Sequence, residues 1–505
     1  MATSVPLHFE VEYFTSLSHS CSWQKHGRMS RYPAHSHSMR IFFSYFALVF
    51  CGLVLAACDL YEKPGPPLDK TDELVVITVN SPDTYYENSD GSYAGLEFDL
   101  VSEFSKELGV EVKFKMVPKL SQALLALENL QGRFAAGLNI TDKHGSGARF
   151  GPVYQRTQPQ VAYNTDFLKP RNIQHLAGRS IEIATGTSHA ERLNEAKQQV
   201  PDLKWIEVDL PAEELLAKLA EGKIDYAVAD STQVNLAKNF YPNLGTAFNL
   251  GEETGKAWAF PPNADSELLA KAQKFFERIE QDGTLKRLLD RYYGHIQRLE
   301  QMDVGGILKK MHTLLPDLRG HFHQAEELTG IDWRLIAALA YKESHWDRLA
   351  TSFTNVRGIM MLTESTADRM KVTDRLDARQ SILAGARYLL LLKEMLPPRI
   401  AEPDRTWIAL AAYNLGYGHV EDARILAQRL GSNPDSWADL KKILPLLSSS
   451  KYFDNLKHGY ARGDEALILT ESVRTYYDIL LRYERPYSRN SAATEAIGPL
   501  RHSRN

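Results

Sequence analysis

The sequence predicts an α/β domain built from two units, followed by a second domain that is mainly α-helical. β-branched runs alternate with amphipathic segments over residues 72–294, the order expected of doubly wound α/β units. Over residues 307–485 the apolar residues recur mainly at helical spacing. The 505 residues fit two to three domains at roughly 150 residues each. The apolar content of 44% is ordinary for a globular protein, and the net charge of −4 gives no indication of nucleic-acid binding.

The chain begins with three segments that we assign to neither domain. Residues 1–38 lack helical or strand periodicity, so they are either a disordered extension or the result of a start codon assigned too early, with Met39 as the alternative start. Residues 39–58 join a short basic region to an apolar core and a small-residue end, the pattern of a signal peptide, although a retained signal anchor stays open. Residues 59–71 carry Pro, Gly and charged residues and are expected to form a tether.

The end of the apolar segment resembles a lipobox. Leu55-Ala56-Ala57-Cys58 carries the small residues and the cysteine of that signal, which implies a lipidated Cys58 and membrane anchoring; the alternative is a chance cysteine. Asp59 resembles the inner-membrane retention signal of enteric bacteria. All three cysteines precede residue 60, so the rest of the chain can form neither a disulfide framework nor a cysteine-based metal site.

Strands and helices of the α/β domain are predicted from the period of the apolar residues. The first unit has expected strands at 74–80, 110–117 and 134–140 and expected helices at 95–108 and 120–130. The second unit has expected strands at 181–184 and 224–229 and expected helices from Ala190, at 213–219 and at 268–289.

Four short motifs make this domain resemble the family 3 extracellular solute-binding proteins. They are Gly95–Leu100, Ala184–Ser188, Gly222–Tyr226 and Asp282–Thr284. The resemblance covers about residues 72–293 and implies a periplasmic-binding-protein-like fold of two lobes joined by two crossings. We place the crossings near residues 163–167 and 258–261.

A ligand between the lobes has modest support from the residues. Thr187 and Ser188 precede a helix, so backbone N–H groups there can hold a carboxylate. Asp230 follows a buried strand and can take an ammonium group, so the pair suits an amino acid or a muropeptide. Transport-type relatives usually carry an arginine clamp shortly after Ile140, where this chain has residues 141–144 as Thr-Asp-Lys-His. A domain that kept the fold and lost the ligand stays open.

The second domain follows a polar link at residues 295–306 and contains one carboxylate in an unusual place. Asp332 is a suitable N-cap, and Ile336, Leu339, Ala340 and Glu343 then follow at i, i+3, i+4 and i+7 on one helix face. Burial on this apolar face and the negative end of the helix dipole both raise the pKa of a carboxyl group. A glutamate protonated near neutral pH is a proton donor for a glycosidic oxygen. The alternative is a solvated glutamate at a helix end.

Three motifs in order make residues 307–477 resemble the soluble lytic transglycosylase domain, a mainly α lysozyme-like fold. They are Glu343-Ser344, Gly358–Leu362 with its Met360-Met361 pair, and Ala412–Gly416 with its Tyr413-Asn414 pair. The resemblance implies that Glu343 is the only catalytic residue and that Tyr413 bonds it. The usual family form has Met-Gln where Met361 stands, so a substrate amide contact is altered; the Met-Met form resembles one membrane-bound branch.

Further site residues also rest on the resemblance or on local chemistry. We expect Ser344 and Asn414 to hold substrate or the helix end, Asn414 and Gly416 to take positive φ, and Tyr476 or Tyr477 to line the cleft. His321 and His323 are not spaced for a shared metal on a helix face, so no metal is expected. Residues 486–505 are expected to be disordered.

The resemblance implies cleavage of peptidoglycan glycan strands between N-acetylmuramic acid and N-acetylglucosamine, with a 1,6-anhydro product and no metal or organic cofactor. Neither Asp347 nor Glu364 is expected to act as the second carboxylate of an ordinary glycosidase. Two alternatives stay open: a hydrolase of the same fold, and a non-catalytic cell-wall or solute sensor. We expect the protein to be located at the periplasmic face of a membrane. The resemblance favours the outer membrane, whereas Asp59 favours the inner membrane.

Overall fold

The computed structural model describes residues 73–488 apart from 82–83, 88–91, 119, 141–147 and 296–300. Six predicted features lie outside the described residues wholly or in part: the N-terminal extension, the signal peptide with Cys58, the tether with Asp59, the altered clamp, residues 296–300 of the polar link, and nearly all of the C-terminal tail. Within the described residues, no helix is both long enough and apolar enough to cross a bilayer.

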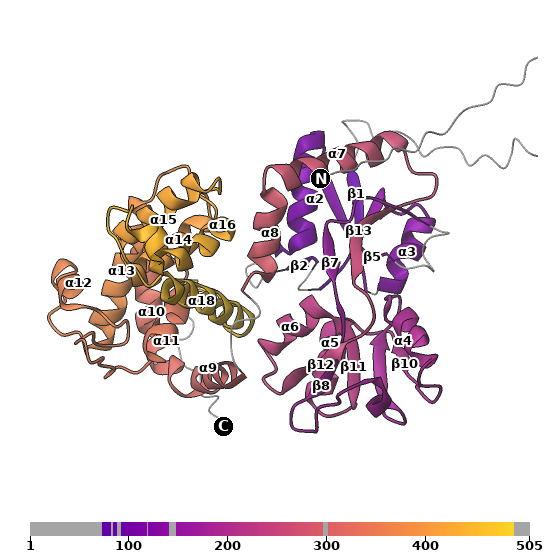
Figure 1. Ribbon diagram of the computed structural model, residues 1–505, viewed down its shortest axis with the longest axis horizontal. Helices are drawn as coiled ribbons and strands as arrows, with labels where there is room; N and C mark the ends of the chain where they lie inside the picture. The colour runs from indigo at the N-terminus through magenta and orange to yellow at the C-terminus, as the bar shows by residue number, and fades with distance from the viewer. Residues whose placement is uncertain are drawn as a thin grey trace, which may run out of the picture. The chain divides into compact units, whose positions relative to one another are not determined.

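The first lobe is a mixed sheet with the strand order β4-β1-β5-β13-β6, and β7 pairs with β13 (Figure 1). Three parallel strands come from the N-terminal unit, and the antiparallel β13 returns from much later in the chain. The strands are β1 (Leu74–Val79), β4 (Val112–Val117), β5 (Phe134–Asn139), β6 (Arg149–Phe150), β7 (Gln155–Thr157) and β13 (Thr254–Phe260); the helices are α2 (Leu96–Leu108), α3 (Leu120–Glu128), α7 (Ser266–Gln281) and α8 (Thr284–Tyr293). A two-residue hairpin pairs β2 (Tyr86–Glu87) with β3 (Tyr93–Ala94).

The second lobe is a five-stranded sheet with the order β10-β9-β11-β8-β12. Its strands are β8 (Pro159–Asn164), β9 (Ile181–Ala184), β10 (Ile206–Val208), β11 (Tyr226–Asp230) and β12 (Leu244–Asn249); its helices are α4 (His189–Lys197), α5 (Ala212–Ala220) and α6 (Ser231–Lys238), with a 3₁₀ turn at Ile173–Leu176. The two sheets confirm the predicted two-lobed fold.

The predicted crossings between the lobes were wrong by several residues. The chain changes sheets at Gln158, between β7 and β8, and again between Asn249 and Thr254. Residues 163–164 and 258–260 instead lie inside strands, where Tyr163 pairs with Tyr226 and Ala259 with Ala135. β-branched and aromatic runs do not show where one sheet stops and the next begins.

The C-terminal domain is helical around one hydrophobic core, as predicted. Its helices are α9 (Gln301–Thr313), α10 (Leu315–Thr329), α11 (Trp333–Ser344), α12 (Glu364–Arg369), α13 (Ala378–Met395), α14 (Asp404–Leu415), α15 (Tyr417–Arg429), α16 (Trp437–Ile443), α17 (Ser450–Phe453) and α18 (Gly463–Tyr483), with a 3₁₀ turn at Leu444–Ser448. Helix α9 begins inside the predicted polar link. Helix α11 runs through the core, where all nine residues from Trp333 to Tyr341 are buried.

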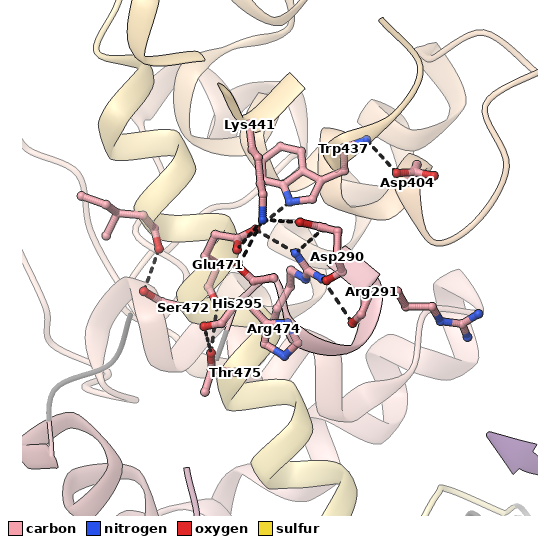
Figure 2. Close-up of polar contacts among 12 residues, drawn as sticks. Asp290, Arg291, His295, Asp404, Trp437, Lys441, Glu471, Ser472, Arg474 and Thr475 are labelled. Carbon is pink, nitrogen blue, oxygen red and sulfur yellow. Dashed lines mark hydrogen bonds and ion pairs between the residues drawn. The ribbon is translucent and has the colours of Figure 1, made fainter. Parts of the chain in front are cut away.

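A buried network of charged side chains joins α8 to α16 and α18 (Figure 2). Glu471 is fully buried and accepts hydrogen bonds from the Trp437 indole at 2.6 Å and from Arg474 at 2.8 Å. Arg474 also donates to the Asp290 carboxylate at 3.2 Å and to its backbone carbonyl at 2.7 Å, and Lys441 pairs with both acids. Two acids face two cations, and this pairing is what allows such charges to be buried.

Candidate active site

Helix α11 carries the predicted acid, and local contacts fix where the helix begins and ends. Asp332 is the N-cap, because its Oδ1 accepts a hydrogen bond from the Arg334 amide at 2.8 Å. After Ser344 the backbone takes left-handed φ values at His345 (53°) and Trp346 (62°), which stops the helix. The Trp346 ring is buried, so this stop is held by packing. Glu343 therefore lies in the partly buried last turn of a helix whose preceding nine residues are buried.

Glu343 lies on the apolar face predicted from the sequence. The other residues of that face, Ile336, Leu339 and Ala340, are fully buried, and Glu343 itself is partly buried. Among the residues that the structure describes, none donates a hydrogen bond to its carboxylate. Burial raises the pKa of Glu343 to about 8, and only the nearby charge of Lys342 acts in the lowering direction. The side chain is therefore mostly protonated at neutral pH, and the alternative of a solvated glutamate does not fit.

The Gly358–Leu362 segment forms a tight turn beside the end of α11. Ser344 Oγ donates to the Ile359 carbonyl at 2.8 Å, so the residue after Glu343 is tied directly to this turn. Gly358 is required there, because its φ is +82° and a Cβ would lie 1.8 Å from the Arg375 carbonyl oxygen. The position of Ser344 fits the helix-end role expected of it.

The two methionines of the turn differ in exposure. Met360 is fully buried, and its side chain packs so closely on Gly385 of α13 that a Cβ on that glycine would lie 2.6 Å from the methyl carbon. Met361 is partly buried and has a φ of 45°, the left-handed region. The structure therefore gives Met360 a packing role, and the altered substrate contact at Met361 remains a prediction.

Tyr413 approaches the turn from the end of α14. Its hydroxyl donates its proton to the Met360 carbonyl at 3.1 Å. The resemblance implied a bond between Tyr413 and Glu343, but the tyrosine proton is not used in such a bond. Burial raises the pKa of Tyr413 well above its usual value, and the charge of Glu343 raises it further. The predicted positive φ of Asn414 was wrong, because Asn414 is an exposed helical residue of α14, and only Gly416 turns positive, at 90°.

The predicted cleft tyrosines lie away from Glu343. Tyr477 donates to the Asp332 carboxylate at 3.0 Å, at the opposite end of α11. Glu343 follows Asp332 by eleven positions, which is about 16 Å along a helix at 1.5 Å per residue. Tyr476 is 1% exposed and packs edge-on against Tyr341, their ring centroids 4.8 Å apart. Tyr341 precedes Glu343 by two residues and so faces the other side of the helix. Both tyrosines therefore contact α11 at residues other than Glu343, and the lining of a cleft by one of them remains a prediction.

The structure shows three supporting residues that the sequence had not indicated. Arg375 Nη1 donates to the Asn355 carbonyl at 2.7 Å and to the Leu362 carbonyl at 3.1 Å, so one guanidinium holds both ends of the loop that contains the turn. Ser381 Oγ accepts the Met360 amide proton at 3.2 Å, and the Tyr388 ring lies 5.4 Å from that of Tyr413. None of the three lies in a family motif; Ser381 and Tyr388 both lie on α13, and Arg375 lies in the loop before it.

Neither of the two carboxylates considered as a partner for Glu343 is buried. Asp347 and Glu364 are both exposed, and the Asp347 carboxylate accepts the Leu349 amide in a local turn. His323 packs between aromatic rings, 4.4 Å from that of Tyr487. Within the described part of the chain, no group of three or more His, Cys, Asp or Glu side chains could hold a metal ion.

Two of the three predicted ligand residues of the first domain, Thr187 and Asp230, line a small cavity of about 80 Å³ between the two sheets. The Thr187 hydroxyl donates to the Ala184 carbonyl at 2.8 Å, and the buried Ser188 hydroxyl lies 3.3 Å from that of Thr254. Both hydroxyls are therefore used within the protein, which leaves the backbone N–H groups as the predicted carboxylate site.

The Asp230 carboxylate already has several protein partners, and it also caps α6 by accepting the backbone N–H of Gln233. His189 Nε2 lies 3.2 Å from its Oδ1, Asn139 donates to its Oδ2 at 3.2 Å, and Lys256 Nζ lies 3.9 Å away. Burial acts to raise the pKa of Asp230, but the hydrogen bonds and positive charge of these neighbours outweigh it and hold the pKa well below its usual range. An incoming ammonium group would therefore have to compete with Lys256 and His189.

The two domains match two separate families. Residues 320–434 match the family described as the Transglycosylase SLT domain, and residues 74–295 match the Bacterial extracellular solute-binding proteins, family 3. An ancestral arginine-binding protein bound to arginine has 20% sequence identity and a TM-score of 0.41 over 45% of this chain and 100% of that chain.

Relatives resemble nearly the whole chain. It is 67% identical over 452 residues to the membrane-bound lytic murein transglycosylase F of Nitrosospira multiformis, covering 89% of this chain and 95% of that protein. It is 52% identical over 437 residues to the protein of the same name in Methylobacillus flagellatus, covering 86% of this chain and 93% of that protein. It is 46% identical over 447 residues to the protein of the same name in Thiobacillus denitrificans, covering 88% of this chain and 94% of that protein.

Proposed function

Because this chain belongs to the membrane-bound lytic murein transglycosylase F family, we propose that Glu343 is the single acid and base of its peptidoglycan-cleaving reaction. The protein is a lytic murein transglycosylase that acts on peptidoglycan. The finer proposal is that it cuts between N-acetylmuramic acid and N-acetylglucosamine and leaves 1,6-anhydro ends, in cell-wall remodelling. The observation that carries this proposal is a partly buried glutamate that receives no hydrogen bond from any described residue and has a pKa of about 8.

The proposed reaction uses one proton twice. Protonated Glu343 gives its proton to the glycosidic oxygen, the bond from that oxygen to the anomeric carbon of N-acetylmuramic acid breaks, and N-acetylglucosamine leaves as an alcohol. The Glu343 carboxylate then takes the proton of the 6-hydroxyl of the same N-acetylmuramic acid, and that oxygen bonds to the anomeric carbon. The carboxyl group regains its proton and no water is consumed, so a second carboxylate to activate water is unnecessary.

The direct test uses Glu343→Gln with isolated sacculi. The variant should fold and release no anhydro-muropeptides, because its amide cannot give up a proton near neutral pH. A matched control is Glu394→Gln, which changes an exposed glutamate in the last turn of α13 and should release products at the wild-type rate. Undiminished release by Glu343→Gln would remove Glu343 from the catalytic role.

Mass spectrometry of the products separates the proposal from its two alternatives. A hydrolase leaves a reducing end, whereas a transglycosylase leaves a product lighter by one water. A non-catalytic cell-wall sensor binds glycan and releases nothing. The partly buried Glu343, the turn that holds Ser344 and the neighbouring Tyr413 favour the enzyme over the sensor.

For the first domain we propose a regulatory role in which an amino acid or muropeptide binds between the lobes and changes access to Glu343. The cavity at Thr187 and Asp230 supports a site there, and the neutralised Asp230 supports a ligand held mainly through its carboxylate. Calorimetry of the full-length protein with free amino acids and cell-wall peptides should give heat with one of them. No heat with any would favour a domain that kept only the fold.

We also propose that Cys58 is lipidated and anchors the protein to the periplasmic face of a membrane. The family resemblance favours the outer membrane, whereas Asp59 favours the inner membrane. The membrane-bound name of the relatives supports attachment. Cys58→Ser should move the protein from the membrane fraction to the periplasmic fraction, and gradient separation of the membranes distinguishes outer from inner. An unchanged membrane fraction would contradict lipid anchoring at Cys58.

A further inference from the structure

Lys256 is a buried cation in the cleft between the two sheets of the first domain. It lies on β13 of the first sheet and lines the same cavity as Asp230, which ends β11 of the second sheet. The side chain of Lys256 is 5% exposed and that of Asp230 is 3% exposed. Lys256 Nζ lies 3.9 Å from Asp230 Oδ2, so a buried ion pair crosses the cleft.

Two further polar contacts cross the same cleft. Asn139, at the end of β5 in the first sheet, donates to Asp230 Oδ2 at 3.2 Å. The buried Ser188 hydroxyl of the second lobe lies 3.3 Å from that of Thr254 at the start of β13. The cavity that remains has about 80 Å³, whereas sites for small-molecule ligands usually measure roughly 300–1,000 Å³. The two lobes are therefore closed on each other through their own side chains.

Asp230 has little capacity left for a ligand. A carboxylate offers about four lone-pair sites. His189 Nε2 and Asn139 Nδ2 each lie 3.2 Å from one of its oxygens, and the Gln233 amide donates to the same side chain. Lys256 supplies a positive charge beside it. A ligand ammonium group would therefore meet a carboxylate that is already in use and a second cation of like charge.

We propose that the ε-ammonium group of Lys256 takes, on Asp230, the place of a ligand ammonium group, so that the cleft accepts peptides with an acylated amino end and rejects free amino acids. In a muropeptide the peptide is joined to the sugar through its amino end, which is therefore a neutral amide. The choice of ligand rests on the regulatory role proposed above for this domain. The place of Lys256 can be tested without any natural ligand.

Chemical rescue tests the place of the lysine cation directly. In full-length Lys256→Ala, Asp230 loses its cation, and the shortened side chain leaves room for a small ammonium ion. Ethylammonium chloride should give this variant a saturable rise in Tm that sodium chloride at the same concentration does not give, because an ion that binds only the folded state stabilises it. The wild type should respond alike to the two salts. An equal response of Lys256→Ala to both would overturn the proposal.

The same comparison decides if Lys256→Ala does not fold by itself. Circular dichroism should then show the folded state with ethylammonium chloride and not with sodium chloride. A chain that stays unfolded in both salts, or folds in both, would count against the proposal.

Two matched variants control for ethylammonium bound elsewhere. Lys218→Ala removes a lysine that pairs with Glu182 and does not line the cavity, so ethylammonium should not rescue it. The double variant Lys256→Ala with Asp230→Asn removes both charges of the cleft pair and should not be rescued either, because no carboxylate remains there for the ammonium ion. Rescue of the double variant would contradict the assigned site.

Calorimetry of the full-length protein tests the ligand. The dipeptide L-alanyl-γ-D-glutamate and its N-acetyl form differ only in the charge of the amino end. The wild type should bind the acetylated form at least about tenfold more tightly, and Lys256→Ala should prefer the free form, because a hydrogen-bonded charge pair is worth at least one factor of ten. Equal binding of both forms by the wild type would overturn the proposed selectivity. No heat with either form would refute the regulatory ligand, and the rescue experiment would then decide the place of Lys256 alone.

Discussion

Replacing Glu343 by glutamine should stabilise the folded protein at neutral pH and leave its stability nearly unchanged in acid. The pKa of this carboxyl group rises from 4.5 to about 8 on folding. Below pH 4.5 the group is protonated in both states and contributes no penalty. Between pH 4.5 and pH 8 the unfolded chain ionises while the folded chain does not, so stability is lost progressively as pH rises. Glutamine cannot ionise and escapes this loss.

Linkage sets the size of the effect. Between pH 5 and pH 7.5, Glu343→Gln should gain at most about 3 kcal/mol over the wild type, from 1.36 kcal/mol for each unit of pKa difference. The value of about 3 kcal/mol is an upper limit, because solvent reaches part of the Glu343 side chain. Urea unfolding of both proteins at the two pH values measures the gain as a difference between variants, so the other titrating groups cancel.

The same urea series should show no pH-dependent gain for Glu394→Gln, the exposed glutamate in the last turn of α13. If the stability difference between Glu343→Gln and the wild type were equal at pH 5 and pH 7.5, the side chain would not be held protonated by burial. The physical basis of the proposed mechanism would then be refuted, whatever the activity of the variant.

Three further substitutions test the supports of the site. Gly358→Ala should abolish activity, because the new methyl group would overlap the Arg375 carbonyl, whereas Gly320→Ala, where a Cβ meets nothing within 4 Å, should be active and slightly more stable by thermal unfolding. Glu471→Gln should cost about 3–5 kcal/mol in urea unfolding, because it leaves buried cations underneutralised, whereas Glu465→Gln removes an exposed pair and should cost less than about 1 kcal/mol. Tyr477→Phe should lower stability while leaving the pH profile of kcat unchanged, and a shifted profile would contradict its placement far from Glu343.

Much of the fold follows from local periodicity. The buried strand β1 is marked by a β-branched run and forms where predicted. The single helix predicted over 268–289 from apolar residues at helical spacing was wrong in its extent, because the chain forms two helices, α7 and α8, separated at Gly283, where φ is 78°. The burial of the helix face that carries Glu343 could also be predicted from the sequence. A helix packs its apolar side into the core, so a polar residue on that side is buried with it. These signals are local, so no knowledge of the fold was needed.

The errors concern features that depend on residues far apart in the sequence. The first crossing was placed inside β8, because which sheet a strand joins is set by its partners and not by its own residues. Asn414 can adopt positive φ, but α14 continues through it, since Gly416 two residues later ends the helix more readily. The contacts of Tyr476 with Tyr341 and of Tyr477 with Asp332 likewise depend on the packing of α18 on α11, which no local pattern predicts.

The position of the acid depends on contacts at both ends of one helix. At its start, Asp332 caps α11 and is held by Tyr477 from α18. At its end, Ser344 is held by the Gly358–Leu362 turn. Glu343 itself receives no hydrogen bond from any described residue, so these contacts and its apolar face are what keep the carboxyl group in place. A group that must both give and regain a proton cannot be held strongly in either form, so its placement falls to the backbone that carries it.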